Sequence, residues 1–199
     1  YIPLVAFIPY LGPYCLIFIE YSCIFLLFLE GMLSCQINKK YIRAAKSKLS
    51  VYSGEKIIIT GSYGKTSTKL LFNQVLNVYS SSVATPKSYN TPLGISKFIN
   101  GECIELYPYL VLEYGASKVG DIQELCAIAR PDVAVVCEIG LMHMDGFKTL
   151  ENVIQEKMSL IRNCKMAILC YENEYIRSYP VHNKIVLSYG FNYGDYTAR

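Results

Sequence analysis

The chain has 199 residues, of which 52% are hydrophobic and 18% charged, and its formal net charge is +3. This composition is apolar for a soluble protein. The net charge is too small to indicate nucleic-acid binding. The sequence also has no basic stripe with interleaved aromatic residues, which such binding would call for. The apolar excess is concentrated at the start, because Glu20 and Glu30 are the only charged residues from Tyr1 to Cys35. We therefore expect a membrane segment joined to a globular domain.

Residues 1–35 are the expected membrane segment. Two apolar stretches, about Ile2–Leu11 and Tyr14–Leu29, are divided by Gly12 and Pro13. Neither is an uninterrupted run of about 20 apolar residues, the length that spans a bilayer. A single span, a membrane hairpin and a buried hairpin of a soluble protein all stay open.

Residues 36–53 are the expected juxtamembrane helix or linker. Between Gly31 and Gly54 the chain carries five Lys or Arg residues and no acid. A basic flank after an apolar segment marks the cytoplasmic side and suits anionic headgroups. The stretch 38–49 lacks Gly and Pro, which suits a helix lying on the membrane surface.

Eight cysteines are scattered along the chain without a C-x-x-C pair. Cys137 and Cys170 lie inside apolar runs, where cysteine behaves as a small hydrophobic residue. We expect reduced core thiols rather than disulfides or a zinc site.

Residues 54–199 alternate between β-rich and helical patterns. The expected strands are Lys56–Thr60, Ser82–Thr85, Tyr109–Glu113, Val133–Glu138, Lys165–Cys170 and Lys184–Ser188. The expected helices are Lys65–Tyr79, Asp121–Ala129, Leu150–Arg162 and Glu172–Ser178. Continuous apolar strands indicate burial on both faces, so the pattern predicts a three-layer α/β domain with a mainly parallel sheet. Ligands of such domains bind at the carboxyl ends of the strands.

A phosphate-binding loop is the strongest motif, in KIIITGSYGKTSTK at residues 56–69. A strand leads into a glycine turn and then a helix, so backbone N–H groups and the helix N-terminus can converge on phosphate oxygens. The lysine would neutralise the β- and γ-phosphates of ATP, and the threonine hydroxyl would ligate Mg²⁺. The expected nucleotide-binding residues are Gly61, Ser62, Tyr63, Gly64, Lys65, Thr66 and Ser67.

Only two residues separate Gly61 from Gly64, whereas the general Walker pattern has four between its glycines. This T-G-x-x-G-K-T form resembles the loop of the Mur ligase superfamily, which includes the peptidoglycan amide ligases, folylpolyglutamate synthetase and cyanophycin synthetase. The segment TPKSYNTPLGIS at 85–96 is similar to that of ligases which add D-alanyl-D-alanine to a muramoyl tripeptide. The resemblance covers residues 54–199 and implies the P-loop-containing central ATP-binding domain of these ligases.

The downstream motifs extend the resemblance. Glu113 ends an apolar strand, where a carboxylate can ligate the same Mg²⁺ as Thr66. By resemblance, Asn90 and Thr91 face the substrate and the γ-phosphate. The family pattern E-x-G-x-x-x-x-G-D-I is matched by Glu113, Gly115, Gly120, Asp121 and Ile122.

A second Mg²⁺ is also implied by the resemblance. His143 matches the family histidine that helps to hold it, and Lys157 matches a lysine that many members carbamylate to give a further ligand. The expected catalytic residues are thus Lys65, His143 and Lys157, and the expected metal ligands are Thr66, Glu113, His143 and Lys157.

The implied activity is ATP-dependent amide-bond formation between a carboxylate and an amine through an acyl phosphate, in peptidoglycan precursor synthesis. The expected substrates are a carboxylate-bearing cell-wall precursor and an amino acid or dipeptide, with the catalytic domain on the cytoplasmic side of the cell membrane. Two departures stand out. A membrane segment takes the place of the UDP-sugar-binding domain, and the late H-N-x-x-N stretch and the C-terminal domain are missing from the sequence. We expect the fragment alone to be inactive.

Three alternatives stay open. The chain could be another ligase of the superfamily, of the folylpolyglutamate or cyanophycin synthetase kind. It could be a P-loop NTPase or kinase of another class. Such proteins have a Walker-B aspartate at the end of a strand, whereas this sequence has Glu113 and His143 instead. It could also be a nonenzymatic nucleotide-binding membrane protein or an inactive fragment.

Overall fold

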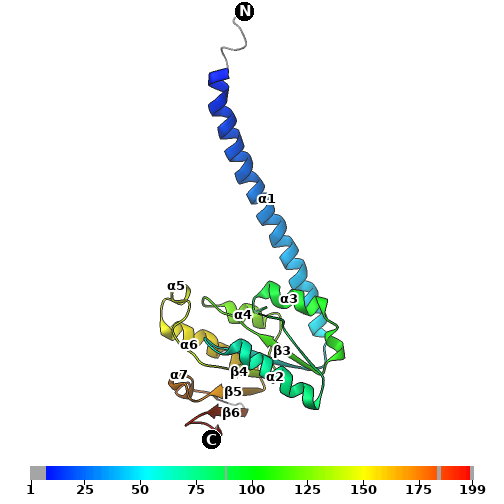
Figure 1. Cartoon of the computed structure of the whole chain (residues 1–199), viewed down its shortest axis with the longest axis vertical. Coiled ribbons are helices and arrows are strands. Elements are labelled where there is room, and N and C mark those ends of the chain that lie inside the picture. The colour runs from blue at the N-terminus through cyan, green and yellow to red at the C-terminus, as the bar shows by residue number, and fades with distance from the viewer. Residues whose placement is uncertain (1–7, 88, 183–184, 198–199) are drawn as a thin grey trace, which may run out of the picture. The chain divides into compact units, whose positions relative to one another are not determined.

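The structure consists of a long helix and an α/β domain (Figure 1). It is a computed structural model that describes residues 8–87, 89–182 and 185–197. Helix α1 runs from Ile8 to Ser50 and includes Gly12 and Pro13, so this part is one helix rather than a hairpin. The stretch expected at Ile2–Leu11 lies mostly outside the described residues. The chain divides into two compact units, Tyr1–Lys40 and Tyr41–Arg199, and α1 contributes to both.

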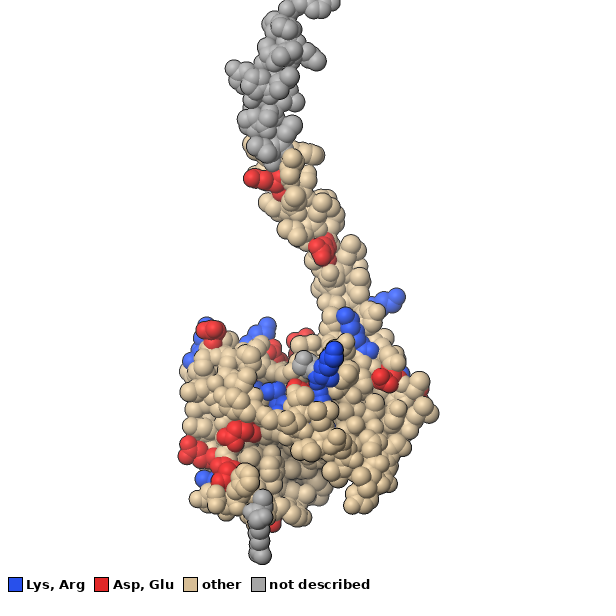
Figure 2. All heavy atoms as spheres, viewed as in Figure 1, with Lys and Arg blue, Asp and Glu red and all other residues tan. Residues whose placement is uncertain are grey.

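The α1 segment of the first unit is apolar and exposed. Its large side chains from Ile17 to Ile37 are all solvent-accessible, among them Phe18 at 73%. By length and composition, α1 is the one helix among the described residues that is able to cross a membrane. A helix that is apolar all round needs a nonaqueous environment. Figure 2 shows few charged side chains along this part and basic ones toward its carboxyl end.

The carboxyl-terminal turns of α1 belong to the globular unit. Ile42 and Leu49 pack against the core and Ala45 is fully buried in it. Asn100 donates a hydrogen bond of 2.9 Å to the Tyr41 carbonyl. The basic segment is therefore helical, but its apolar positions face the core of the domain. This differs from the expected helix lying on a membrane surface, and the globular unit begins at Tyr41 rather than Gly54.

The sheet has seven strands in the order β2-β3-β1-β4-β5-β6-β7, and all neighbours are parallel. The strands are β1 (Glu55–Thr60), β2 (Ser82–Ala84), β3 (Tyr109–Glu113), β4 (Val133–Val136), β5 (Met166–Cys170), β6 (Ile185–Gly190) and β7 (Tyr196–Thr197). This confirms the predicted parallel sheet, to which the structure adds β7. Strands with apolar residues on both faces require a helical layer on each side.

Two cores lie on the two faces of the sheet and confirm the three-layer architecture. Helix α2 (Lys65–Tyr79) covers one face through Phe72 and Leu76. The other face carries α3 (Pro92–Gly101), α4 (Asp121–Cys126), α6 (Leu150–Met158) and α7 (Glu174–Arg177). The short elements are η2 (Ile104–Leu106), α5 (Met144–Phe147) and η3 (Ser159–Asn163). Cys126, Cys137, Cys164 and Cys170 are buried, as expected for core thiols, whereas Cys23, Cys35 and Cys103 are exposed.

Helix α3 is not among the helices that the sequence analysis expects. Thr91 caps it by accepting a hydrogen bond of 3.2 Å from the Gly94 amide, and Pro92 occupies its first turn. A threonine followed by proline is a helix-start signal, so this helix was detectable.

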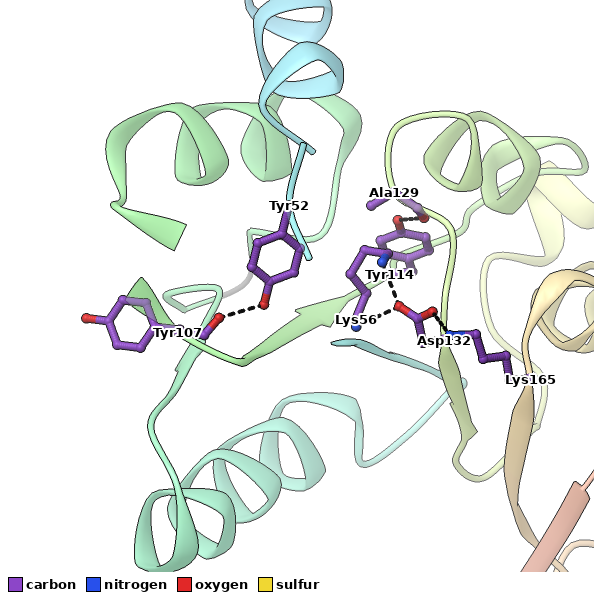
Figure 3. Close-up of polar contacts among 7 residues, drawn as sticks. All are labelled: Tyr52, Lys56, Tyr107, Tyr114, Ala129, Asp132 and Lys165. Carbon is purple, nitrogen blue, oxygen red and sulfur yellow. Dashed lines mark hydrogen bonds and ion pairs between the residues drawn. The ribbon is translucent and has the colours of Figure 1, made fainter. Parts of the chain in front are cut away.

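An ion-pair network fixes the amino-terminal edge of the sheet (Figure 3). Asp132 pairs with the Lys56 ammonium at 2.6 Å and the Lys165 ammonium at 3.0 Å. It also accepts a bond of 3.0 Å from the Lys56 amide. Burial raises the pKa of Asp132, but the hydrogen bonds from Lys56 and Lys165 outweigh it and hold that pKa below its usual value.

Replacing Asp132 by asparagine should destabilise the α/β unit by about 1.5–3 kcal/mol near neutral pH, because charged hydrogen bonds are lost. A carboxylate with a lowered folded-state pKa stabilises the fold above its unfolded pKa of about 3.9 and loses this contribution as the pH falls through the folded value. The difference between wild type and Asp132→Asn in urea unfolding should therefore shrink below about pH 4. Exposed Asp145, changed to asparagine, is the control. A pH-independent difference would contradict the ion-pair assignment.

Candidate active site

The predicted site residues lie at the carboxyl edge of the sheet. Strand β1 is between β3 and β4, so the loop after β1 lies beside the ends of both neighbours. Ile59 is opposite Glu113 in β3, and Thr60 is opposite Val136 in β4. This is the edge at which parallel α/β sheets bind ligands.

Glycine is required at two positions of the phosphate loop, Gly61 and Gly64. Gly61 has φ 151° and Gly64 has φ 79°, conformations that disfavour any side chain. A Cβ on Gly61 would also lie 2.8 Å from the Cβ of Cys137. Gly64 precedes the first residue of α2 and turns the chain into the helix.

Ser62 and Tyr63 anchor the loop to the chain after β4. The Ser62 amide donates to the Glu138 carbonyl at 2.7 Å, and its hydroxyl bonds the Gly140 carbonyl at 2.9 Å. The Tyr63 amide also donates to Glu138, at 3.3 Å. These amides point inward, whereas the first turn of a helix leaves its own N–H groups without intrahelical acceptors. The loop can thus offer phosphate the amides at the start of α2.

Lys65 folds back over the loop. Its ammonium donates to the carbonyls of Gly61 at 2.9 Å and Ser62 at 3.0 Å. Burial lowers the pKa of Lys65, and the negative charge of Glu113 opposes this lowering. The loop thus holds a cation beside the turn that a phosphate group would enter.

Glu113 is the centre of the site and is only 1% exposed. The Thr66 hydroxyl donates to its Oε2 at 3.0 Å, which brings together the two side chains expected to share a Mg²⁺. Asn90 Nδ2 donates to its Oε1 at 3.3 Å. Lys69, to which the sequence analysis gave no role, places its ammonium 3.0 Å from Oε2.

A cavity of about 380 Å³ adjoins this carboxylate through Asn90. Thr91 and His143 also line it, as does Asp121. His143 is exposed, has φ 53° and immediately precedes α5. The structure therefore brings His143 and the Asn90–Thr91 pair, distant in the sequence, to one cavity.

Lys157 lies on α6 and is 1% exposed. Its ammonium is 5.8 Å from the centre of the Phe147 ring. Burial, followed by the positive charge of Lys65, lowers the pKa of Lys157 to about 8. A buried lysine with a lowered pKa is a reactive amine, unlike a solvated surface lysine.

Closed metal sites require several ligands from the protein. Among the side chains that the structure describes, no three of His, Cys, Asp or Glu gather as such a site would require. The available donor set is a hydroxyl and a carboxylate, Thr66 and Glu113. This suits Mg²⁺, which is usually held by one or two carboxylates together with substrate phosphates and water.

Two supporting residues were missed by the sequence analysis. Asn173 donates to Glu138 Oε1 at 2.7 Å and to the Ile139 carbonyl at 2.8 Å, which supports the chain that anchors Ser62. Locally, Asn173 is marked only as the N-cap of α7, where its side chain accepts from the Ile176 amide at 3.2 Å, because its partners near the site are distant in sequence. Lys69 carried a weak signal, since it lies one helical turn after Lys65 on the same face.

Comparison with known proteins identifies a family and similar chains. The family model of the Mur ligase middle domain matches residues 59–199, more than half of the chain. A UDP-N-acetylmuramoyl-tripeptide--D-alanyl-D-alanine ligase of Mycobacterium leprae is 38% identical over 122 residues, covering 61% of this chain and 23% of that protein. The ligase of the same name from Borreliella burgdorferi is 29% identical over 146 residues, covering 72% and 31%.

A solved structure is similar as well. The MurF ligase of Thermotoga maritima in complex with ADP has a TM-score of 0.73 and 34% identity, covering 79% of this chain and 38% of that chain. The present chain spans about a quarter to a third of the length of the two curated relatives.

Replacing Gly61 by alanine should weaken Mg²⁺–ADP binding about tenfold or more. The new Cβ would clash with Cys137, and a side chain at this φ costs about 1–3 kcal/mol. Titration calorimetry measures the change. Gly101→Ala is the matched control, because a Cβ there meets no atom of the described structure within 4 Å. Equal affinities of the two variants would contradict the proposed role of the loop.

Proposed function

Because the chain belongs to the Mur ligase family through its middle domain, we propose that it is the nucleotide-binding part of an ATP-dependent ligase that joins a carboxylate to an amine. The observation that carries this proposal is the 3.0 Å contact between Thr66, in the phosphate loop, and Glu113, at the end of β3. These residues are 47 positions apart and form one oxygen donor pair beside the loop lysine.

The substrates are proposed from the relatives. Their names describe a UDP-linked muramoyl tripeptide and D-alanyl-D-alanine, one a carboxylate and the other an amine. The proposed substrates are therefore a carboxylate-bearing cell-wall precursor and an amino acid or dipeptide, in peptidoglycan precursor synthesis. Asn90 and Thr91 line the cavity beside Glu113, which is where we place the carboxylate that accepts the phosphoryl group.

Each residue has a distinct proposed role. Lys65 and the amides at the start of α2, from Gly64 to Ser67, neutralise and orient the phosphates. Thr66 and Glu113 hold one Mg²⁺, while Ser62 and Tyr63 fix the shape of the loop. When bound, ATP supplies the phosphoryl group that activates the carboxylate as an acyl phosphate, and Mg²⁺ offsets its charge. The chain itself contributes position and charge, and the reaction needs no protein nucleophile.

His143 and Lys157 are the proposed ligands of a second Mg²⁺. Lys157 is buried next to the positive charge of Lys65, an environment that favours its neutral form. A neutral amine can add CO₂ to form a carbamate, which turns this cation into an oxygen ligand. The burial of Lys157 supports this assignment, because a permanent cation there would oppose the nearby Lys65.

We also propose that α1 anchors the ligase in the cell membrane, with the α/β unit on the cytoplasmic side. The support is the exposed apolar surface of the helix and the basic residues after it. Lys39, Lys40, Arg43 and Lys46 are all exposed there. A basic flank of this kind stays in the cytoplasm.

In the whole ligase to which this nucleotide-binding part belongs, release of ADP and phosphate should require a carboxylate and an amine together, tested with UDP-muramoyl tripeptide and D-alanyl-D-alanine. Lys65→Ala should lower the rate by about 10²–10³-fold, as does the loss of other groups that stabilise developing charge. Lys97→Ala, at an exposed position of α3, is the control. ATP hydrolysis that ignores both substrates would contradict the ligase assignment.

The full chain should stay with the membrane fraction after washing with high salt and alkaline carbonate. The apolar surface of α1 would be exposed to water if the protein were released. A variant that begins at Asn38 keeps most of the basic flank and should be released by salt. Extraction of the full chain by salt alone would show that α1 does not span the membrane.

A further inference from the structure

Lys69 is a buried cation that the proposed function does not use. Its side chain is completely inaccessible to solvent, although lysine is almost never buried without a partner. Its ammonium is 3.0 Å from Glu113 Oε2, the oxygen that also accepts the Thr66 hydroxyl. The buried carboxylate and the buried ammonium therefore compensate each other.

The same ammonium has a second partner in the connection from β2 to α3. It donates a hydrogen bond to the carbonyl of Lys87. Lys87 has φ 46°, a conformation uncommon for a residue with a side chain. Lys69 therefore supports a strained position of the segment that carries Asn90 and Thr91.

Glu113 holds that segment at two further points. Its amide donates to Thr85 Oγ1 at 3.3 Å, and its Oε1 accepts from Asn90 at 3.3 Å. Lys69 lies on α2, and its one ammonium nitrogen contacts both Glu113 at the end of β3 and the Lys87 carbonyl in the β2–α3 connection. It therefore links these three parts of the chain.

We propose that Lys69 is a positioning residue that couples Mg²⁺–nucleotide binding at Glu113 to the substrate-facing segment before α3. A metal ion at Glu113 changes the charge that Lys69 faces, and Lys69 conveys this change to the Lys87 carbonyl. The inference rests on the proposed nucleotide site, and it assigns Lys69 no contact with the reacting atoms.

Hydrogen exchange of the full chain tests this, with and without Mg²⁺–ADP. Two amides report on the segment: Tyr89 N–H bonds the Pro86 carbonyl at 3.1 Å, and Gly115 N–H bonds the Asn90 carbonyl at 2.9 Å. In the wild type, Mg²⁺–ADP should slow exchange in the loop 61–67 and change that of Tyr89 and Gly115 about fivefold or more, a usual size for coupled sites. In Lys69→Met the loop should still respond, and so should Gly115 through the bond between Asn90 and Glu113, whereas Tyr89 should not.

The matched control is Lys56→Met. It removes an ammonium that is 2.6 Å from Asp132 at the opposite edge of the sheet (Figure 3), so it lowers stability without touching the site. It should respond to Mg²⁺–ADP as the wild type does. A Lys69→Met chain that keeps the response of Tyr89 overturns the proposal. A wild-type loop that does not respond to Mg²⁺–ADP refutes the nucleotide site instead.

A second pair of variants covers the case in which Lys69→Met does not fold because Glu113 is left as an unpaired buried charge. Lys69→Met/Glu113→Gln is then compared with Glu113→Gln, both without nucleotide. Faster exchange of Tyr89 in the double variant supports the link through Lys87. Equal exchange in the two variants overturns it.

Discussion

The buried charge of Glu113 is the constraint on which the site depends. An ionised carboxylate away from water is stable only if charges and hydrogen bonds surround it. Here Thr66 and Lys69 bond one oxygen and Asn90 bonds the other. Because these partners come from α2 and from the connection between β2 and α3, satisfying one carboxylate fixes three parts of the chain. The geometry that stabilises the charge is thus also the geometry that would present it to the proposed Mg²⁺.

The parallel sheet makes this arrangement possible. Each β–α crossover returns the chain to the same edge, so the ends of β1, β3 and β4 meet there despite their separation in sequence. The loop after β1 depends on its neighbours in a specific way: Gly61 has room for no side chain beside Cys137, and the Ser62 amide and hydroxyl bond the chain after β4. The parallel arrangement of the strands therefore both buries them and shapes the site.

Much of this was predictable from local patterns. Apolar runs marked β1 to β6, and helix α2 begins and ends where predicted, at Lys65 and Tyr79. Helix α3 was missed, although its Thr-Pro start is a local helix-start signal. The partners of Lys69 and Asn173 at the site could not be assigned, since they are set by the fold and not by spacing. The basic end of α1 was predicted as a helix, but only the core contacts of Ala45 show which side it buries.

Positive charge gathers around the phosphate loop, and this determines what the site can bind. Lys65 is held by the carbonyls of Gly61 and Ser62, acceptors that bear only partial charge. Lys157 is buried, and the charge of Lys65 lowers its pKa further. Lys69 is different, because Glu113 neutralises it.

Two of the three lysines therefore lack a full countercharge within their described contacts, and an anion of several negative charges would supply it. A triphosphate satisfies Lys65 directly, and a carbamate on Lys157 would remove the remaining repulsion by replacing a cation with an anion. The electrostatics of the chain thus favour nucleotide binding and lysine modification, the two events that the proposed function includes.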